Sequence, residues 1–281
     1  MNFRHPLIRR LVQLALEEDL GRGDVTTAAL ERPDEPMKAR VVSREPLVVA
    51  GVPIVATVLD EVGGGGAKLD VRSAEGMAVG SDTVLCEIRA AAGVLLSTER
   101  VILNFLQRMS GVATLTRRYV EAVAGTSAAI TDTRKTIPGW RLLDKYAVVQ
   151  GGGRNHRFGL DDGILLKDNH IVAVGGVTAA IERARAAHHL LPVEVECDTL
   201  AQVDEAVAAG ANVILLDNMK TADMAEAVAR IAGRALVEAS GGVTLARVRE
   251  IAKTGVDLIS VGEITHSAAA VDLSMELGRP R

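Results

Sequence analysis

The sequence has few aromatic residues and no excess of positive charge. One Trp, two Tyr and three Phe occur among 281 residues, and the formal net charge is −4. Proteins that bind nucleic acid usually combine a basic face with aromatic side chains that stack on bases. We therefore expect no nucleic-acid partner.

Long hydrophobic runs are also missing. No apolar stretch approaches the ~18 residues that a membrane span requires, so we expect no membrane partner. The N-terminal stretch MNFRHPLIRRLVQLALEEDL has apolar residues at helical spacing, interrupted by Gln13, Glu17, Glu18 and Asp19. This pattern is typical of an amphipathic helix and not of a signal peptide.

Cysteine is scarce, which argues against a disulfide framework. Cys86 and Cys197 lie in apolar, strand-like contexts and lack the spacing of metal ligands. Such residues are best interpreted as small buried hydrophobes in a reducing cytosol. We expect a cytoplasmic location.

The first part of the chain has the pattern of a sheet flanked by helices. Residues 37–96 alternate and break at Gly turns, with helices expected at roughly 5–20 and 97–124. The stretch EGMAVGSDTVLCEI is similar to the hairpin of biotinyl and lipoyl carriers, but its tip has no Lys to modify. We expect an N-terminal open α/β sandwich over 1–111, to which a C-terminal helix over 267–281 returns.

The second part repeats a strand, a loop and a helix. Between the apolar runs lie TLAQVDEAVAAG, TADMAEAVARIAG and TLARVREIAKTG, each beginning at a Thr suited to N-capping and ending at Gly; the runs themselves end in Glu196, Asp217, Glu238 and Ser260. Such βα units form a parallel sheet that curls toward a barrel. With earlier strands in AAITDTR and DDGILLKDNH, we expect an irregular, about six-stranded α/β barrel over 112–266.

Polar residues follow the predicted strands, where the active site of such a fold lies. The cations there imply a multiply charged anionic ligand, because like charges repel unless anions compensate; they are Arg134, Lys135, His156, Arg157 and Lys167. Pairing with nearby aspartates, at 132, 161, 162 and 168, is the alternative explanation.

Two further groups complete this rim. Glu196 and Asp217 could hold Mg²⁺ or accept hydrogen bonds from sugar hydroxyls, or form salt bridges across the rim. The loops ASGGVT, before a helix expected near Thr244, and SVGEITHS could bind phosphate through backbone N–H groups. Plain tight turns are the alternative for both loops.

Several stretches together resemble the quinolinate phosphoribosyltransferase family over nearly the whole chain. The most specific is TDTRKTIPGWRLLDKYAVVQGGGRNHRFGLDDGILLKDNH; EEDLGRGDVTT, TERVILNFLQRMSGVAT, EVEC, LLDNM, EASGG and SVGEITHS agree with it. The resemblance implies that quinolinate and phosphoribosyl pyrophosphate give nicotinate mononucleotide, pyrophosphate and CO₂ with Mg²⁺, in NAD biosynthesis. It also implies a homodimer in which each subunit lends an arginine, here Arg100, to its partner.

The resemblance also implies roles for individual residues. Lys135, Glu196 and Asp217 are expected to be catalytic, with Lys135 near the pyrophosphate and the two acids near the ribose and Mg²⁺. The quinolinate carboxylates should meet Arg134, His156, Arg157 and Lys167. The 5′-phosphate and other substrate contacts fall to Thr133, Ser240, Gly241, Gly242, Ser260, Val261, Gly262 and His266.

Three other functions stay open from the residues alone. A Schiff-base aldolase-type barrel could use Lys135 or Lys167 as its nucleophile. A related pyrophosphorylase could act on another base, although KDNH and the Arg/His set disfavour it. A non-enzymatic carrier is disfavoured by the hairpin without Lys.

Overall fold

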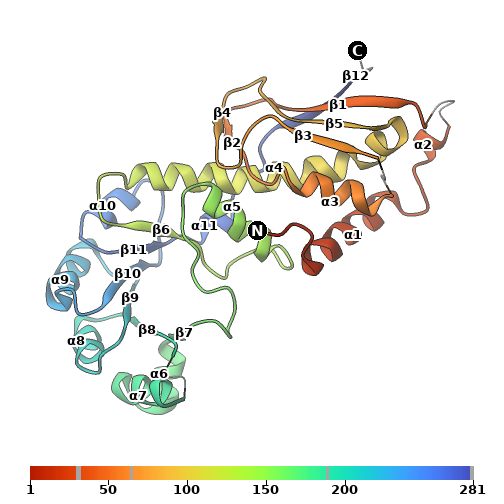
Figure 1. Cartoon of the computed structure of the whole chain (residues 1–281). Helices are drawn as coiled ribbons and strands as arrows, with labels where there is room; N and C mark the ends of the chain where they lie inside the picture. The colour runs from red at the N-terminus through yellow and green to blue at the C-terminus, as the bar shows by residue number, and fades with distance from the viewer. Residues whose placement is uncertain (30–32, 64–65, 188–189, 279–281) are drawn as a thin grey trace. The chain divides into compact units, whose positions relative to one another are not determined.

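The structure is a computed structural model that describes residues 1–29, 33–63, 66–187 and 190–278. It forms two compact units (Figure 1). Unit one comprises Met1–Arg117, Ile137–Gly152 and Ser267–Arg281, and unit two comprises Arg118–Thr136 and Gly153–His266. The expected domain limits at 111 and 266 stay a prediction. In the part of the chain that the structure describes, no helix combines the length and the apolar character needed to cross a bilayer.

Unit one is built on a four-stranded antiparallel sheet in the order β12-β1-β5-β3. Its strands are β1 (Pro36–Ser43), β3 (Lys68–Val71), β5 (Val84–Ala91) and β12 (Leu273–Gly278), and β2 (Leu47–Val48) pairs with β4 (Ala78–Val79). The helices are α1 (Pro6–Leu20), α2 (Val25–Ala28), α3 (Ile54–Glu61), α5 (Arg141–Gln150) and α4 (Ala92–Ala122), which extends into unit two.

Helix α4 supplies much of the core of unit one. Leu95, Ile102, Leu106 and Met109 recur at helical spacing and are buried. Gly111 on the same helix faces the backbone of Ala269, where an added Cβ would lie 2.0 Å from the carbonyl oxygen. A glycine is therefore required where the C-terminal segment passes over α4.

The expected C-terminal helix over 267–281 is wrong in its secondary structure. Residues 273–278 form β12, which pairs antiparallel with β1. Leu273 and Met275 are buried, whereas Ser274 and Glu276, which follow them in turn, are half-buried, and this period of two is that of a strand. The pairing with an open strand edge, rather than helix propensity, decides the structure here.

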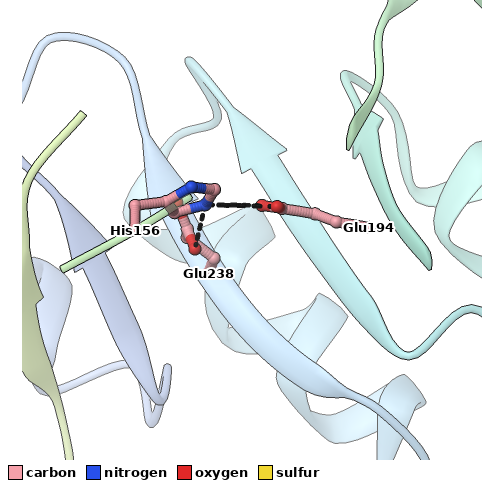
Figure 2. A group of neighbouring side chains, drawn as sticks. All are labelled: His156, Glu194 and Glu238. Carbon is pink, nitrogen blue, oxygen red and sulfur yellow. Dashed lines mark hydrogen bonds and ion pairs between the residues drawn. The ribbon is translucent and has the colours of Figure 1, made fainter. Parts of the chain in front are cut away.

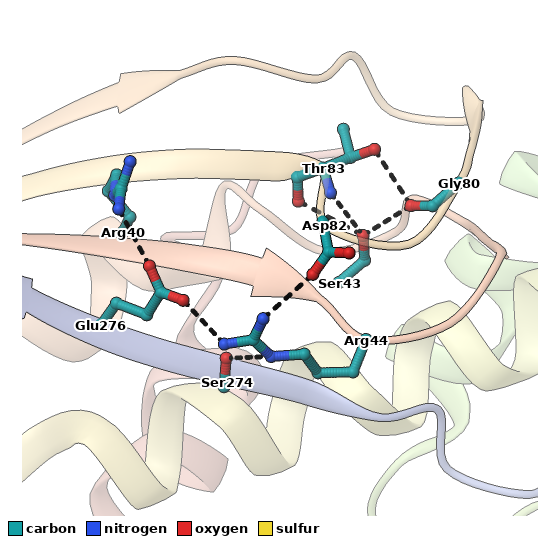
Figure 3. A network of polar contacts seen from close by, with 8 residues as sticks. All are labelled: Arg40, Ser43, Arg44, Gly80, Asp82, Thr83, Ser274 and Glu276. Carbon is teal, nitrogen blue, oxygen red and sulfur yellow. Dashed lines mark hydrogen bonds and ion pairs between the residues drawn. The ribbon is translucent and has the colours of Figure 1, made fainter.

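An ion network crosses the outer part of this sheet (Figure 3). Arg44 donates to Asp82 Oδ1 at 3.1 Å, to Glu276 Oε1 at 2.7 Å and to Ser274 Oγ at 2.8 Å. Arg40 donates to the other oxygen of Glu276 at 2.9 Å. The charged side chains are largely exposed, so water screens their interactions.

Unit two is a six-stranded parallel sheet in the order β6-β11-β10-β9-β8-β7, as the fold prediction requires. Its strands are β6 (Ala129–Thr131), β7 (Ile164–Leu166), β8 (Val193–Cys197), β9 (Val213–Asp217), β10 (Leu236–Ser240) and β11 (Leu258–Ser260). Helices cover the sheet and connect its strands: α6 (Asp168–Val174), α7 (Val177–Ala187), α8 (Leu200–Ala208), α9 (Thr221–Ile231), α10 (Val248–Ala252) and α11 (Glu263–His266).

The helix limits only partly follow the expected caps. Thr199 caps α8 by accepting from the Gln202 N–H, as predicted. The Thr rule is wrong for α9, whose N-cap is Lys220, and for α10, whose N-cap is Arg247. Gly210, Gly233 and Gly255 follow the three helices with positive φ, as expected, but the helices themselves end earlier, at Ala208, Ile231 and Ala252.

Candidate active site

A cavity of about 440 Å³ opens at the carboxyl ends of the parallel strands. It brings together most of the residues that the sequence pointed to: Thr133, Arg134, Lys135, His156, Arg157, Lys167, Glu196, Asp217, Ser240, Gly241, Gly242 and Ser260. All belong to unit two. Asp132, Leu165, Leu215, Asn218 and Glu238 also line it.

Strand alternation explains which side chains reach this cavity. On β10, Leu236, Glu238 and Ser240 share the face toward the barrel interior, because successive side chains of a strand point to opposite faces. On β8, Glu194 and Glu196 share that face, while Val195 and Cys197 point the other way and are buried. Each strand thus carries a chain of inward residues that ends at the cavity.

The cations of the cavity lie close enough to influence one another. Burial lowers the pKa of the Arg157 guanidinium, and the positive charge of Arg134 lowers it further. Lys167 Nζ lies 3.2 Å from Glu196 Oε2, with the lysine side chain 49% and the glutamate 14% exposed. An anion bound between the two arginines would relieve their repulsion.

Hydrogen bonds hold the backbone of Lys135, and its side chain lines the cavity. Its N–H donates to Thr133 Oγ1 at 3.0 Å, and its carbonyl accepts from Thr265 Oγ1 at 2.8 Å. Gly262 lies against its stem: an added Cβ there would meet Lys135 Cδ and the His266 ring at 3.1 Å. Gly262 and His266 therefore stand behind Lys135 rather than among the lining residues.

Two other predicted residues also lie outside the lining. Val261 is buried, with 1% exposure, and its N–H donates to the Thr131 carbonyl at 3.0 Å, so this N–H is not available to a ligand. Arg100 lies on α4 in unit one, whereas the cavity is lined by unit two.

The loop after β10 approaches the end of β9 through glycine. Gly241 has φ +87°, and an added Cβ would lie 2.2 Å from Asn218 Oδ1. Asn218 itself has φ 54° and donates from Nδ2 to Asp217 Oδ2 at 2.7 Å. The helix expected near Thr244 is wrong, because α10 begins at Val248. The loop therefore has no helix start behind it, and phosphate binding there stays a prediction.

Sequence reasoning missed two acids in the barrel interior. Glu194 and Glu238 are 7% and 1% exposed, and both face the ring of His156 (Figure 2). Ser260 Oγ donates to Glu238 and lies 2.9 Å from Thr131 Oγ1. The available signal was the two-residue alternation, which puts Glu194 on the same face as Glu196. The sequence pattern also predicts a strand end at Glu238, whereas β10 continues to Ser240.

A second cavity, of about 370 Å³, lies toward the amino ends of the same strands, where Val213, Leu236 and Leu258 begin β9, β10 and β11. His156, Arg157 and Glu238 line both cavities. These side chains therefore form a wall inside the barrel between two open spaces.

The described residues contain one group of at least three His, Cys, Asp or Glu side chains close enough to share a metal ion: His156, Glu194 and Glu238. Glu196 and Asp217 are not in such a group. They offer carboxylate oxygens from neighbouring strands to one cavity. This donor set suits Mg²⁺ held by one or two carboxylates together with substrate phosphates, rather than a cage of protein ligands.

Both cysteines are free and buried, as predicted. Burial raises the pKa of Cys86 and of Cys197 to about 12, so neither thiol is ionised near neutral pH.

Known proteins are similar to this chain in sequence and in fold. The models of the quinolinate phosphoribosyl transferase N-terminal and C-terminal domains match residues 24–110 and 112–276. The chain is 46% identical over 274 residues to the nicotinate-nucleotide pyrophosphorylase [carboxylating] of Mycobacterium leprae, covering 96% of each chain. It also resembles the structure of the nicotinate-nucleotide pyrophosphorylase from Francisella tularensis, with TM-score 0.92, 36% identity and coverage of 97% and 96%.

A similar match is found to the nicotinate-nucleotide pyrophosphorylase from Ehrlichia chaffeensis. Its TM-score is 0.90 at 41% identity, covering 96% of this chain and 98% of that chain. Sequence models and relatives thus agree over both units. The chain belongs to the quinolinate phosphoribosyl transferase family.

Proposed function

We propose that the chain transfers a phosphoribosyl group from phosphoribosyl pyrophosphate to quinolinate and releases pyrophosphate and CO₂, giving nicotinate mononucleotide for NAD synthesis. The observation that carries this proposal is the cavity in which Arg134 and Arg157 repel each other beside Lys167. A ring with two carboxylates would neutralise such a group. Arginine also suits planar carboxylates, because its guanidinium binds them in a bidentate manner.

The remaining lining residues suit the second substrate. Lys135 serves as a point charge for the departing pyrophosphate, and the Ser240–Gly242 loop together with Ser260 offers polar groups to the 5′-phosphate. Glu196 and Asp217 face the same cavity from β8 and β9. Their negative charge would stabilise the oxocarbenium-like sugar that develops as pyrophosphate leaves.

The second step needs no further organic cofactor. Once the ring nitrogen bonds to C1 of the ribose, the ring is a cation. The C2 carboxylate leaves as CO₂, its bonding electron pair stays on C2, and C2 then takes a proton. The task of the protein is to hold the ring with its nitrogen toward C1, which is a positioning role for the cations.

Magnesium is part of the proposal and would be held by Glu196 and Asp217 together with substrate phosphates. The ion would neutralise the charge of the leaving pyrophosphate. Glu196 already contacts Lys167, so this lysine would compensate the acid before the ion arrives.

The direct test is CO₂ release from quinolinate carboxyl-labelled at C2, with phosphoribosyl pyrophosphate and Mg²⁺. Omission of any one component should abolish release. Nicotinate should be a very poor substrate, because it lacks the 2-carboxylate and leaves part of the cation cluster uncompensated. Comparable rates with nicotinate would assign the chain to another base. Trapping of a lysine–substrate adduct by borohydride would instead favour the Schiff-base mechanism.

A homodimer in which Arg100 enters the partner's site is also proposed. Support comes from its motif, TERVILN, and from its location on α4 in unit one, apart in sequence from the lining residues. A twofold dimer makes such an exchange reciprocal. A cytoplasmic location belongs to the same proposal and is supported by the two free, buried cysteines.

Mixed dimers test the exchange. Arg100→Ala and Lys135→Ala homodimers should each lose about ten- to a hundredfold in activity, the value of a charged hydrogen bond. In a heterodimer, one site carries both substitutions and the other carries neither. Activity should therefore rise when the two inactive variants exchange subunits. Verified heterodimers without activity would show that Arg100 acts within its own chain or not at all.

A further inference from the structure

The ring of His156 is held inside the barrel by two acids from different strands. Its Nε2 lies 3.1 Å from Glu194 Oε2 on β8 and 3.4 Å from Glu238 Oε2 on β10. Figure 2 shows one ring nitrogen facing both carboxylates. The histidine side chain is 16% exposed, and the acids are 9% and 1% exposed, so water competes little for these contacts.

Further hydrogen bonds hold the backbone and side chains of His156 and Arg157. The His156 N–H donates to Asp132 Oδ1 at 2.9 Å, and Nδ1 accepts from the Arg157 N–H at 2.9 Å. The Arg157 guanidinium donates to the Gly163 backbone carbonyl at 2.9 Å. Residues 155–157 belong to no helix or strand, so these hydrogen bonds fix the backbone from which Arg157 reaches the cavity.

We propose that Glu194 and Glu238 are positioning residues for the quinolinate site, which hold His156 and, through its ring, the backbone of Arg157. This inference rests on the proposed function. Neither acid needs to touch substrate. Glu238 lines the cavity but is only 1% exposed, and its other oxygen accepts from Ser260.

The two carboxylates also determine where the ring proton lies. Both acids face Nε2, so in the observed geometry this nitrogen carries the ring proton and directs it at them. Nδ1 carries no proton there and accepts from the Arg157 N–H, which links the ring orientation to the position of the arginine.

A divalent cation is the competing occupant of the same three side chains, because their ligand atoms all lie within 4.8 Å of one another. The proton on Nε2 already satisfies both carboxylates in the observed geometry. The two occupants exclude each other, since a metal ion would have to displace that proton. Metal content of the purified protein and titration with Zn²⁺ alone therefore discriminate between them.

The kinetic test uses Glu238→Gln and Glu194→Gln, with Asp257→Asn as the matched control. Asp257 also bonds the barrel backbone, accepting from the Val237 N–H, but lines neither cavity. Each Gln variant should raise the KM for quinolinate about tenfold or more, the scale of a charged hydrogen bond, and leave the KM for phosphoribosyl pyrophosphate within about twofold. Glu238→Asp should recover part of the loss, and Asp257→Asn should match the wild type.

Coupling to His156 separates positioning from general damage. If Glu238 acts through the imidazole, the KM for quinolinate in His156→Gln/Glu238→Gln should equal that in His156→Gln. Additive losses, equal rises in both KM values or no change in the quinolinate KM would each overturn the proposal. Binding of one Zn²⁺ per chain that Glu238→Gln abolishes would overturn it as well.

Imidazole ¹⁵N NMR gives a readout that does not depend on activity. In the wild-type protein, one histidine, assigned by its loss in His156→Gln, should show a slowly exchanging Nε2 proton and no titration near pH 6–7. A rapidly exchanging ring that titrates with an ordinary pKa would overturn the proposal. Failure of the labelled-quinolinate assay in the wild type would contradict the proposed function and leave this NMR result to decide the positioning.

Discussion

The molecule contains two networks of charged side chains, one exposed to water (the wet network) and one buried (the dry network), and we expect them to contribute differently to stability. In unit one, Arg44 and Arg40 surround Glu276 on a sheet whose charged side chains are 36–50% exposed. In unit two, His156 lies between Glu194 and Glu238, where the most exposed member is 16% accessible. Water weakens the first network and makes it replaceable, whereas its absence makes the second costly to disturb. The buried network is also the one next to the candidate active-site cavity.

The largest expected effect is on the dry network. Glu238→Ala removes the acceptor of the Ser260 hydroxyl and one of two carboxylates that face His156. We expect a loss of about 3–5 kcal/mol in the free energy of unfolding, as for other broken buried ion pairs. Urea denaturation followed by circular dichroism measures it. A loss below ~1 kcal/mol would mean that water enters the cluster and that the two networks do not differ in kind.

The ion pair of Lys167 and Glu196 lies between the two extremes and sharpens the comparison. It borders the cavity and is half-exposed on the lysine side. Glu196→Gln should lower turnover about ten- to a hundredfold, worth ~1.5–3 kcal/mol, and should leave unfolding nearly unchanged. Asp217→Asn should behave alike. Isothermal titration should show quinolinate binding largely intact; its collapse would contradict the assignment of these acids to the ribose side.

The two networks should also lose stability at opposite ends of the pH range. The pKa of His156 is raised to about 10, so its contribution is complete below the unfolded value of ~6.5 and is lost as the pH rises toward the folded value. We expect a loss of only ~1–2 kcal/mol, the difference between a charged and a neutral hydrogen bond, because a second ring proton on Nδ1 costs the hydrogen bond that this nitrogen accepts from the Arg157 amide.

The contribution of Glu276 to the free energy of unfolding depends on pH in the opposite direction. Its hydrogen bond with Arg44 lowers the pKa of the carboxyl, so the contribution is present above the unfolded value of ~4.3 and is lost as the pH falls. Unfolding free energies of the wild type, His156→Gln and Glu276→Gln across the pH range test both signs. His156→Gln should flatten the alkaline limb alone. An unchanged alkaline limb would show that the buried acids do not hold the ring proton.

The smallest effect is expected for the wet network at neutral pH. Glu276→Gln keeps the size of the side chain and exchanges two exposed ion pairs for weaker hydrogen bonds. The change in unfolding free energy should be about a quarter or less of that for Glu238→Ala. Added salt should reduce it further, because ions screen exposed charges. A change equal to that of Glu238→Ala would remove the distinction between the networks.

The sequence predicts the parts of this molecule that depend on local pattern. Apolar runs that end in Glu196 and Asp217 place those acids at strand ends, and parallel strands bring such ends to one rim, so the cavity lining follows. The cluster around His156 could not be predicted in this way. Glu194 and Glu238 become important only because a loop distant in sequence places an imidazole between them.

The fold prediction also failed where the structure depends on contacts between residues distant in sequence. Residues 273–278 alternate over too short a stretch to exclude a helix, and only the free edge of β1, more than two hundred residues away, makes them a strand. Similarly, the cap of α9 falls at Lys220 although Thr221 is the better capping residue. Tertiary contacts override local preference at such positions.

The division of the chain into units affects how the protein can evolve by recombination. Three segments form unit one and two form unit two, so the polypeptide passes between them four times. The stretch Ile137–Gly152, which lies between the arginine and histidine motifs of the cavity, belongs to unit one. No single crossover in the gene can exchange the barrel for another while keeping its partner unit whole. Exchange of the barrel alone would need several crossovers, and the two units should therefore share one evolutionary history.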